Sequence, residues 1–355
     1  MLTRHFQRLC LSHGGERQYA GWCTAGFTSL QDRGMLLPHN TLDTRRSSLP
    51  TYRGWHPALQ IARVLVVYKK SYYELYKYDY RERHLSRLQQ HHPAIVHTMR
   101  LSHEENQRTL TAVQQALETL SLRYDCVYRG DLAQTTGYDL LLSVGGDGTF
   151  LEVAHFTSVT PVLGVNSDPQ RSTAFFCAAN RRSIQPCLAA LLDGGLPEVR
   201  LSRMQAHIND TPLPYYALND LLVTHVNPAA MTSYTLHLGD VSEAQKSSGV
   251  WIATAAGSTA AIRAAGGRVM PLRSRKLQYL IREPYFGDGQ RFRFLKDFVS
   301  PHMPLRLTSK MRRARVFLDG PHLRFPLGLG DVLTVTLAPT PLRVIGLDGS
   351  RRQRF

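Results

Sequence analysis

The sequence predicts two domains: an α/β domain with a parallel sheet, followed by an all-β domain. The chain has 355 residues, which exceeds the size at which one hydrophobic core stops growing. Up to residue 196, strand-length apolar runs alternate with helical patterns, and such alternation builds parallel βαβ units. From residue 197, β-rich segments separated by turn residues dominate. We therefore assign residues 56–196 to the α/β domain and residues 197–355 to the β-rich domain, whose last segment is expected to pack back on the first domain.

The α/β domain is predicted to begin with a buried strand at residues 61–70, IARVLVVYKK, a β-branched run that ends in charge. A helix is predicted to start at Ser102, because Ser102 and Glu105 form a capping box. The apolar face of this helix is formed by Leu110, Val113, Leu117 and Leu120. Further strands are predicted at 125–129, 139–144 and 161–165, with a helix between the last two and another at 183–195, where Gly194 and Gly195 suit a C-cap.

The second domain is expected to consist of short strands joined by turns. The strands are predicted at 215–226, 233–241, 313–320 and 331–339. Cys126, Cys177 and Cys187 lie among apolar neighbours and are expected to be buried, reduced thiols, since the five cysteines form no CxxC pair.

The charge balance leaves several kinds of ligand open. The chain carries 43 Lys and Arg against 27 Asp and Glu, a formal charge of +16, which suits nucleic acid, an anionic membrane surface or a polyanionic small substrate. The basic residues are scattered, with no zinc-finger spacing, basic zipper or RNA-binding aromatic signature, which argues against nucleic acid. No apolar run approaches the roughly 18 residues that a membrane-spanning helix needs. We therefore expect neither a nucleic-acid nor a membrane partner.

The first 55 residues have the composition of a transit peptide. They contain Arg4, Arg8, Arg17, Arg33, Arg45, Arg46 and Arg53 against Glu16, Asp32 and Asp43. At the start, Leu2, Phe6 and Leu9 share one helical face, as in an amphipathic presequence. We expect mitochondrial targeting; the alternatives are the plastid and the peroxisome, although the final Gln-Arg-Phe does not match the Ser-Lys-Leu signal.

Residues 140–152, LLLSVGGDGTFLE, join an apolar strand to a helix through Gly145, Gly146, Asp147, Gly148 and Thr149. The glycines allow a ligand to approach the backbone closely, and the helix N-terminus presents free N–H groups that favour phosphate. The spacing is neither that of a Walker loop nor GxGxxG. The carboxylate within the loop can accept the proton of an attacking hydroxyl or hold Mg²⁺. The motif thus predicts a phosphate site that carries chemistry.

GGDGT resembles the signature shared by NAD kinases, diacylglycerol and sphingosine kinases and 6-phosphofructokinases. Three later blocks resemble NAD kinases in content and order: GVNSDPQRS from Gly164, ALNDLLV with Asn219 and Asp220, and QKSSGVWIATAAGSTAAIRAAGG from Gln245. The resemblance runs from residue 61 to at least residue 320 and is closest to the mitochondrial animal and plant NADH kinase branch. It implies a Rossmann-like α/β domain and a C-terminal all-β domain.

The resemblance also implies an activity, ATP-dependent phosphorylation of the adenosine ribose 2′-hydroxyl of NAD or NADH, with ATP and Mg²⁺ as cofactors. It makes Asp147 the proton acceptor and implies small-molecule nucleotide partners and a homo-oligomer, a dimer. No residue is predicted as a protein ligand of a metal. The residues expected to bind substrate or nucleotide are Gly145, Gly146, Gly148, Thr149, Asn219, Asp220, Gly257, Ser258, Thr259, Ala260 and Ala261.

Two departures from the family pattern bear on the substrate. Ser248-Gly249 replaces an Asp-Gly pair, and Ala261 stands where an aromatic residue is common. Both changes leave the choice between NAD and NADH open. A lipid kinase with the same loop and a non-catalytic nucleotide-binding protein are the alternatives; the paired Asn219-Asp220 argues against a lipid pocket, and Asp147 within an intact loop argues against a protein without catalysis.

Overall fold

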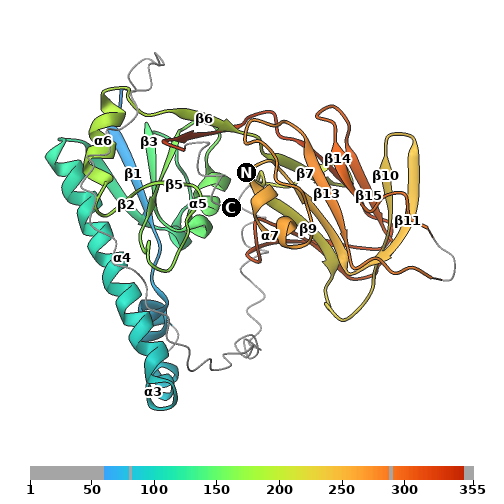
Figure 1. The fold of residues 1–355 in the computed structure, drawn as a ribbon, viewed down its shortest axis with the longest axis horizontal. Coiled ribbons are helices and arrows are strands. Elements are labelled where there is room, and N and C mark those ends of the chain that lie inside the picture. Colours follow the sequence, from blue (N-terminus) through green and yellow to red (C-terminus); the bar gives the residue numbers. More distant parts are fainter. Residues whose placement is uncertain (1–59, 80–81, 288–290, 348–355) are drawn as a thin grey trace, which may run out of the picture. The chain divides into compact units, whose positions relative to one another are not determined.

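In a computed structural model of the protein, which describes residues 60–79, 82–287 and 291–347, the chain forms three sheets (Figure 1). The predicted targeting segment 1–55 lies outside the described residues. The first sheet contains β1 (Arg63–Tyr68), β2 (Arg123–Tyr128), β3 (Leu140–Gly145), β4 (Val162–Asn166), β5 (Cys177–Asn180), β6 (Glu198–Leu201) and β19 (Leu342–Ile345). Within the described ranges, no helix is both long and apolar enough to cross a membrane.

The first sheet has the order β2-β1-β3-β4-β19-β6, and β5 also pairs with β4. Strands β1 to β5 and β19 pair in parallel, while β6 is antiparallel to β19. Alternate residues of β1 and β3 pack on α4 (Pro93–Thr119) and α6 (Ile184–Leu192), and the intervening residues pack on α5 (Asp147–Phe156). Because helices cover both faces, β3 is buried along its whole length, as a central parallel strand should be.

The predicted strands and the helices after β3 and before β6 are confirmed, but the predicted start of the long helix is wrong. Helix α4 begins at Pro93, after the short helices α2 (Tyr72–Glu74) and α3 (Glu82–His91). Proline is favoured in the first turn, where its missing N–H costs nothing. Ser102 lies within the helix, and its hydroxyl donates to Asp168 at 2.6 Å instead of capping. Glu105 pairs with Arg181 at 3.0 Å, so the apparent capping box consists of two contacts to other segments.

The expectation that all three cysteines of the α/β half are buried is also wrong. Cys177 is buried and Cys187 is half-buried, but Cys126 is exposed. Cys126 lies on β2, which is the edge strand of the first sheet. An edge strand leaves part of its surface open to solvent, and the local sequence does not reveal which strand lies at the edge.

The second half forms two antiparallel sheets. The second sheet has the order β11-β10-β15-β18-β7-β8, and the third has the order β14-β13-β12-β9-β16-β17. The second sheet consists of β7 (Met204–Ile208), β8 (Thr211–Pro212), β10 (Thr232–Leu238), β11 (Val241–Ser247), β15 (Leu305–Ser309) and β18 (Val332–Leu337). The third consists of β9 (Asp220–His225), β12 (Gly249–Ala253), β13 (Leu277–Arg282), β14 (Lys296–Val299), β16 (Ala314–Leu318) and β17 (Leu323–Leu327).

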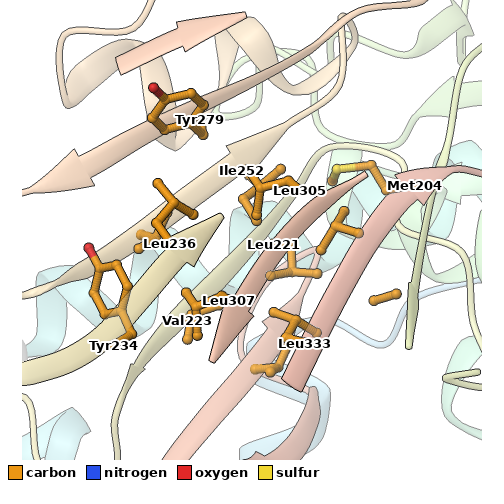
Figure 2. Close-up of a cluster of buried hydrophobic side chains, with 14 of the residues drawn as sticks. Met204, Leu221, Val223, Tyr234, Leu236, Ile252, Tyr279, Leu305, Leu307 and Leu333 are labelled. Atoms are coloured by element: carbon orange, nitrogen blue, oxygen red, sulfur yellow. The ribbon is translucent and has the colours of Figure 1, made fainter. Parts of the chain in front are cut away.

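One apolar cluster joins these two sheets into a sandwich. Leu221, Val223 and Ile252 of the third sheet share it with Leu307 and Leu333 of the second (Figure 2). Along β10, buried and less buried residues alternate, as expected when one face of each sheet lies against the other. The all-β character predicted after residue 197 is therefore confirmed.

The chain returns to the first sheet at its end. Strand β19 lies between β4 and β6, with Val344 opposite Val162 in parallel and Leu342 opposite Leu201 in antiparallel pairing. Strand β6, the first strand after residue 197, belongs to the first sheet as well. Strand β6 thus precedes the sandwich in the chain and β19 follows it, and these two strands are neighbours in the α/β sheet.

Arg203 lies between β6 and β7 and is almost fully buried, with 1% of its surface exposed. Its Nη1 donates to Ala154 O and Thr157 O at 3.1 and 2.7 Å, at the carboxyl end of α5. Its Nε and Nη2 donate to Thr340 O at 3.1 and 2.9 Å. Burial lowers the pKa of the guanidinium to about 10, so it stays charged at neutral pH and complements the negative end of the helix. One side chain therefore ties α5 to the segment before β19.

We expect Arg203→Met to lower the free energy of unfolding by about 3 kcal/mol, because Met fills the space but leaves buried carbonyl groups without donors. Arg200→Met is the matched control: its side chain is 72% exposed and its Nε lies 3.6 Å from Glu198, which also binds Arg343, so losing the Arg200 contact should cost about 0 to 1 kcal/mol. Denaturant unfolding of both variants tests this. Equal losses would contradict the role of Arg203.

Candidate active site

The GGDGT loop lies at the carboxyl end of β3, where Gly145 ends the strand and Asp147 begins α5. A Cβ atom on Gly145 would overlap the Thr149 hydroxyl, so glycine is required there. A Cβ on Gly146 would lie 2.9 Å from Ser172 Oγ. The Thr149 hydroxyl is buried without a hydrogen-bond partner in the described structure, whereas Gly148 is exposed. Thr149 and Ser172 thus pack closely against Gly145 and Gly146, whereas Gly148 is open to solvent.

The Asp147 carboxylate is held by the segment that precedes β5. Its Oδ2 accepts the N–H of Phe175 at 2.9 Å, and its Oδ1 accepts the N–H of Phe176 at 3.0 Å. Phe176 also stacks on Phe150 of α5, with ring centroids 4.8 Å apart. Each carboxylate oxygen keeps acceptor capacity beyond one N–H bond. Asp147 is therefore an anion that the Phe175 and Phe176 amides hold in one orientation at the start of α5.

The GVNSD segment at the end of β4 lies between the GGDGT loop and α4 and is hydrogen-bonded to both. Ser167 N donates to Gly145 O at 3.0 Å, and Ser167 Oγ bonds to Asn106 of α4. Asp168 accepts from Ser102 at 2.6 Å and pairs with Arg171 at 3.0 Å. The inner face of α4 thus fixes the position of the segment beside the glycine loop.

Asn219 and the turn before α7 are in direct contact. A Cβ on Gly257 would overlap the backbone of Asn219, and Thr254 N donates to Asn219 O at 3.0 Å. The Thr254 hydroxyl donates to Leu218 O at 2.5 Å. Asn219 Oδ1 is buried without a partner in the described structure. Two blocks that are far apart in the sequence therefore meet, with one amide oxygen left for a ligand.

The remaining residues of the turn differ in exposure. Ser258 is fully buried; its hydroxyl donates to Ala255 O at 2.7 Å and accepts from Met270 N at 2.9 Å. Thr259 and Ala260 are half-buried, and Ala261 is exposed at the start of α7 (Ala261–Ala264). Ser258 thus shapes the turn, while the residues after it reach the surface.

A buried carboxylate, Asp319, connects this region with α5. Its Oδ1 accepts the N–H groups of Asn219 and Asp220 at 2.7 and 3.1 Å, and its Oδ2 accepts that of Leu218 at 2.7 Å. His155 Nε2, on α5, lies 2.8 Å from Oδ2, and the two side chains are 7% and 0% exposed. The helix that begins at Asp147 is therefore bonded near its end to the carboxylate that holds Asn219.

The surroundings of Asp220 disfavour the ionised form of its carboxyl group. Burial, and secondarily the negative charge of Asp319, raise the pKa of Asp220 to about 7. Between pH 3.8 and about 7 the folded protein therefore keeps a proton that the unfolded chain has lost, so Asp220 makes stability fall as pH rises through this window. A carboxyl group held near half-protonation at neutral pH is a common property of binding and catalytic sites.

The sequence did not single out His155, Asp319 or the Phe175 and Phe176 amides. Asp319 lies within the predicted strand 313–320, and the one signal for it in the sequence is the Asp-Gly pair that follows β16, which is typical of a turn. Its φ of +48° places it in the left-handed region. Among the residues the structure describes, no group of three or more His, Cys, Asp or Glu side chains is arranged to hold a metal ion.

We expect Asp319→Asn to lower the free energy of unfolding by about 3 to 5 kcal/mol, because it removes the negative partner of a buried pair. Asp297→Asn is the control, since this exposed carboxylate also accepts a backbone N–H, from Phe298 at 2.7 Å. Calorimetric melting of both variants measures the difference. A loss for Asp319→Asn no larger than that of the control would contradict the connecting role.

Comparison with known proteins identifies a matching family and named relatives. A family model described as the ATP-NAD kinase N-terminal domain matches residues 60–185. A probable NADH kinase of Oryza sativa subsp. japonica is 36% identical over 263 residues, covering 68% of this chain and 81% of the relative. The NADH kinase of Arabidopsis thaliana is 29% identical over 268 residues, covering 69% and 84%.

Two solved structures share the fold. An NAD kinase from Archaeoglobus fulgidus in complex with ATP has a TM-score of 0.55 at 20% identity, covering 82% of this chain and 96% of that one. Yeast NADH kinase complexed with NADH has a TM-score of 0.59 at 14% identity, covering 83% and 86%. With the match to the rice relative extending over most of both sequences, the chain belongs to the NAD kinase family.

Proposed function

We propose that the protein is an NAD(H) kinase that transfers the γ-phosphoryl group of ATP to the adenosine ribose 2′-hydroxyl of NAD or NADH. One observation carries this proposal: Asp319 bonds the Asn219-Asp220 segment to α5, the helix that begins at Asp147, and the Gly257 turn lies directly against Asn219. Membership of the NAD kinase family supports it, as do relatives named NADH kinase.

Asp147 accepts the proton of the ribose hydroxyl in the proposed reaction. The Phe175 and Phe176 N–H groups hold the carboxylate in one orientation before substrate arrives. A positioned acceptor of this kind matters because a ribose hydroxyl is a poor nucleophile and phosphoryl transfer relies on positioning and electrostatics. Gly145, Gly146, Gly148 and Thr149 present their backbone and the start of α5 to phosphate.

The acceptor dinucleotide binds, in this proposal, where Asn219 meets Gly257. The unpaired Asn219 Oδ1 accepts from a base amino group, and Asp220 accepts from ribose hydroxyls. Thr259, Ala260 and Ala261 continue the surface beyond the buried Ser258. Small side chains there allow a planar ring to approach the backbone. Relatives named NADH kinase make NADH an acceptor to test beside NAD.

In this proposal Mg²⁺ binds together with the phosphates of ATP. The described side chains form no three-ligand cage, and Mg²⁺ characteristically keeps water and phosphate ligands with only one or two carboxylates. Its chemistry is to neutralise charge on the transferring phosphates. The protein's own contribution is the glycine loop, the oriented Asp147 and the helix N-terminus.

Formation of NADPH from NADH, or of NADP from NAD, with ATP and Mg²⁺ tests the function directly. Release of ADP with a diacylglycerol in place of the dinucleotide tests the lipid kinase alternative, which the named relatives do not favour. ADP release with the lipid and none with either dinucleotide would overturn the proposal.

We further propose that residues 1–55 direct the protein to the mitochondrion, that the domains divide near residue 197 and that the enzyme is a dimer. The Arg-rich, acid-poor composition of the first segment supports the targeting. A fluorescent protein fused behind residues 1–60 should co-localise with a mitochondrial marker. Plastid, peroxisomal or diffuse signal would contradict mitochondrial targeting. Light scattering of the purified protein measures its molar mass in solution and so tests whether it is a dimer.

We expect Asp147→Asn to lower kcat by about 10²- to 10⁴-fold, the usual contribution of a general base. The structure adds a second effect. Asn offers one oxygen where two backbone N–H groups need acceptors, so the variant should also lose about 1 to 3 kcal/mol of stability. Steady-state rates and melting temperature are measured on the same preparation.

Asp331→Asn separates the two effects of that substitution. Asp331 also accepts a backbone N–H, from Gly328 at 2.6 Å, together with an amide N–H from Asn209 at 2.7 Å. It lies in the turn between β17 and β18 and has no assigned role in the site. This control should lose stability and keep its turnover. A folded Asp147→Asn enzyme with turnover within about threefold of wild type would refute the assigned role of Asp147.

The raised pKa of Asp220 predicts a pH-dependent affinity for the dinucleotide. Ribose hydroxyls donate to the ionised carboxylate, so binding favours loss of its proton, and the affinity for NADH should fall as pH drops below about 7. The limit for one group is about tenfold per pH unit. Calorimetric titration of wild type and Asp220→Asn between acidic and alkaline pH tests this; an equally steep profile in the variant would assign the effect to another group.

A further inference from the structure

Lys69 directly follows β1, at the same edge of the sheet where β3 ends in the GGDGT loop. Its backbone N–H donates to Val144 O at 3.3 Å, which places it beside the last residues of β3. The side chain is only half-exposed, yet within residues 60–79, 82–287 and 291–347 its ammonium group makes no ion pair or hydrogen bond. A partly desolvated cation without a partner is costly, and such groups are normally paired.

Charged groups around the glycine loop act on Lys69. Burial lowers its pKa, the negative charge of Asp168 opposes that effect, and the positive charge of Arg129 adds to it. Asp168 is not the missing partner, because its carboxylate already accepts from Ser102 at 2.6 Å and pairs with Arg171 at 3.0 Å. The ammonium group of Lys69 is thus close to the loop and is not neutralised by the protein.

Arg129 supplies a second positive charge at the same edge. It begins the short helix after β2, and its Nε lies 3.2 Å from Glu152 Oε2 of α5. A Cβ added to the exposed Gly148 would lie 3.7 Å from Arg129 Nη1. The guanidinium is therefore fixed on one side by Glu152 and extends over the open part of the loop. Cations that follow β1 and β2 flank the N-terminus of the helix that follows β3.

We propose that Lys69, assisted by Arg129, binds the phosphate chain of the nucleotide donor on the GGDGT loop. This assignment rests on the proposed kinase function and specifies which side chains hold the donor. A phosphate oxygen supplies the negative partner that Lys69 lacks, and the interaction is strong because the ammonium group is already partly desolvated. Lys69 therefore sets the affinity for ATP and leaves the affinity for the dinucleotide to Asn219 and Asp220.

Lys69→Met tests the assignment, with Lys70→Met as the matched control. Lys70 is the adjacent lysine, and its Nζ lies 4.7 Å from the centre of the Tyr128 ring, on a different neighbour. In Lys69→Met the KM for ATP should rise about tenfold to a hundredfold, the effect of losing a hydrogen bond to a charged group. The KM for NADH at saturating ATP should stay within about threefold of wild type. Lys70→Met should leave both values near wild type, and Lys69→Arg should recover part of the ATP affinity.

Stability distinguishes ligand binding from a structural role. Removing a desolvated cation that has no partner should leave the melting temperature of the ligand-free protein unchanged or higher, while the rise in melting temperature on adding ATP should shrink. A lower melting temperature for ligand-free Lys69→Met, or unfolding of that variant, would overturn the proposal in favour of a structural lysine. An equal rise in the KM values for ATP and NADH would overturn it too.

Inorganic tripolyphosphate separates this inference from the proposed function. Calorimetric titration measures its binding to wild type, Lys69→Met and Lys70→Met without any turnover. Weaker binding only in Lys69→Met supports the phosphate assignment even if neither NAD nor NADH is phosphorylated, a result that would reject the proposed acceptor. Equal binding to all three proteins would reject the role of Lys69 even if the enzyme makes NADPH.

Discussion

The buried carboxylate of Asp319 is the interaction on which the geometry of the site depends. Its two oxygens accept three consecutive backbone N–H groups, of Leu218, Asn219 and Asp220, and face His155 of α5. An uncompensated carboxylate would be very costly at zero exposure, so the four donors must stay in place while the protein is folded. The contacts of Asp319 therefore connect α5 of the α/β half to residues 218–220 of the β-rich half.

Apolar packing strengthens the same connection. Phe150 and Phe176, next to the Asp147 loop, belong to a cluster that also contains Leu218 and Ala256 of the β-rich half. Leu218 precedes Asn219, and Ala256 precedes Gly257, so the residues that pack between the halves are the immediate neighbours of the proposed dinucleotide contacts. Polar and apolar contacts thus fix the same segment. The site is assembled by the packing of the two halves and does not belong to either one alone.

The local sequence was informative wherever the determinant is itself local. Three glycines around Asp147 mark a strand-to-helix turn, and continuous apolar runs mark β1, β3 and β4 as buried strands, because each pattern reflects the backbone or the two covered faces of one segment. The same reasoning failed at α4. Ser102 and Glu105 have capping-box spacing, but their side chains bond to Asp168 and Arg181, far along the chain.

Contacts between distant residues account for what the sequence did not reveal. His155 and Asp319 are 164 positions apart, and Arg203 reaches Thr340 across 137 positions. Nothing near His155 distinguishes a helix residue that binds a carboxylate from one that faces solvent. The position of Lys69 beside the glycine loop likewise follows from the parallel pairing of β1 with β3, and a single strand does not specify its neighbour.

The position of β19 has a consequence for the order of folding. This strand comes from residues 342–345, yet it lies between β4 and β6 in the sheet that the first half of the chain begins. During synthesis, β19, the strand that lies between β4 and β6, becomes available only after the whole sandwich has been made. Pairings this distant in sequence close slowly, because the loop entropy is lost before the contact forms. Until then the Val162 end of β4, which β5 does not cover, lacks its partner on that side, so the nascent α/β half depends on β19 for protection against wrong pairing there.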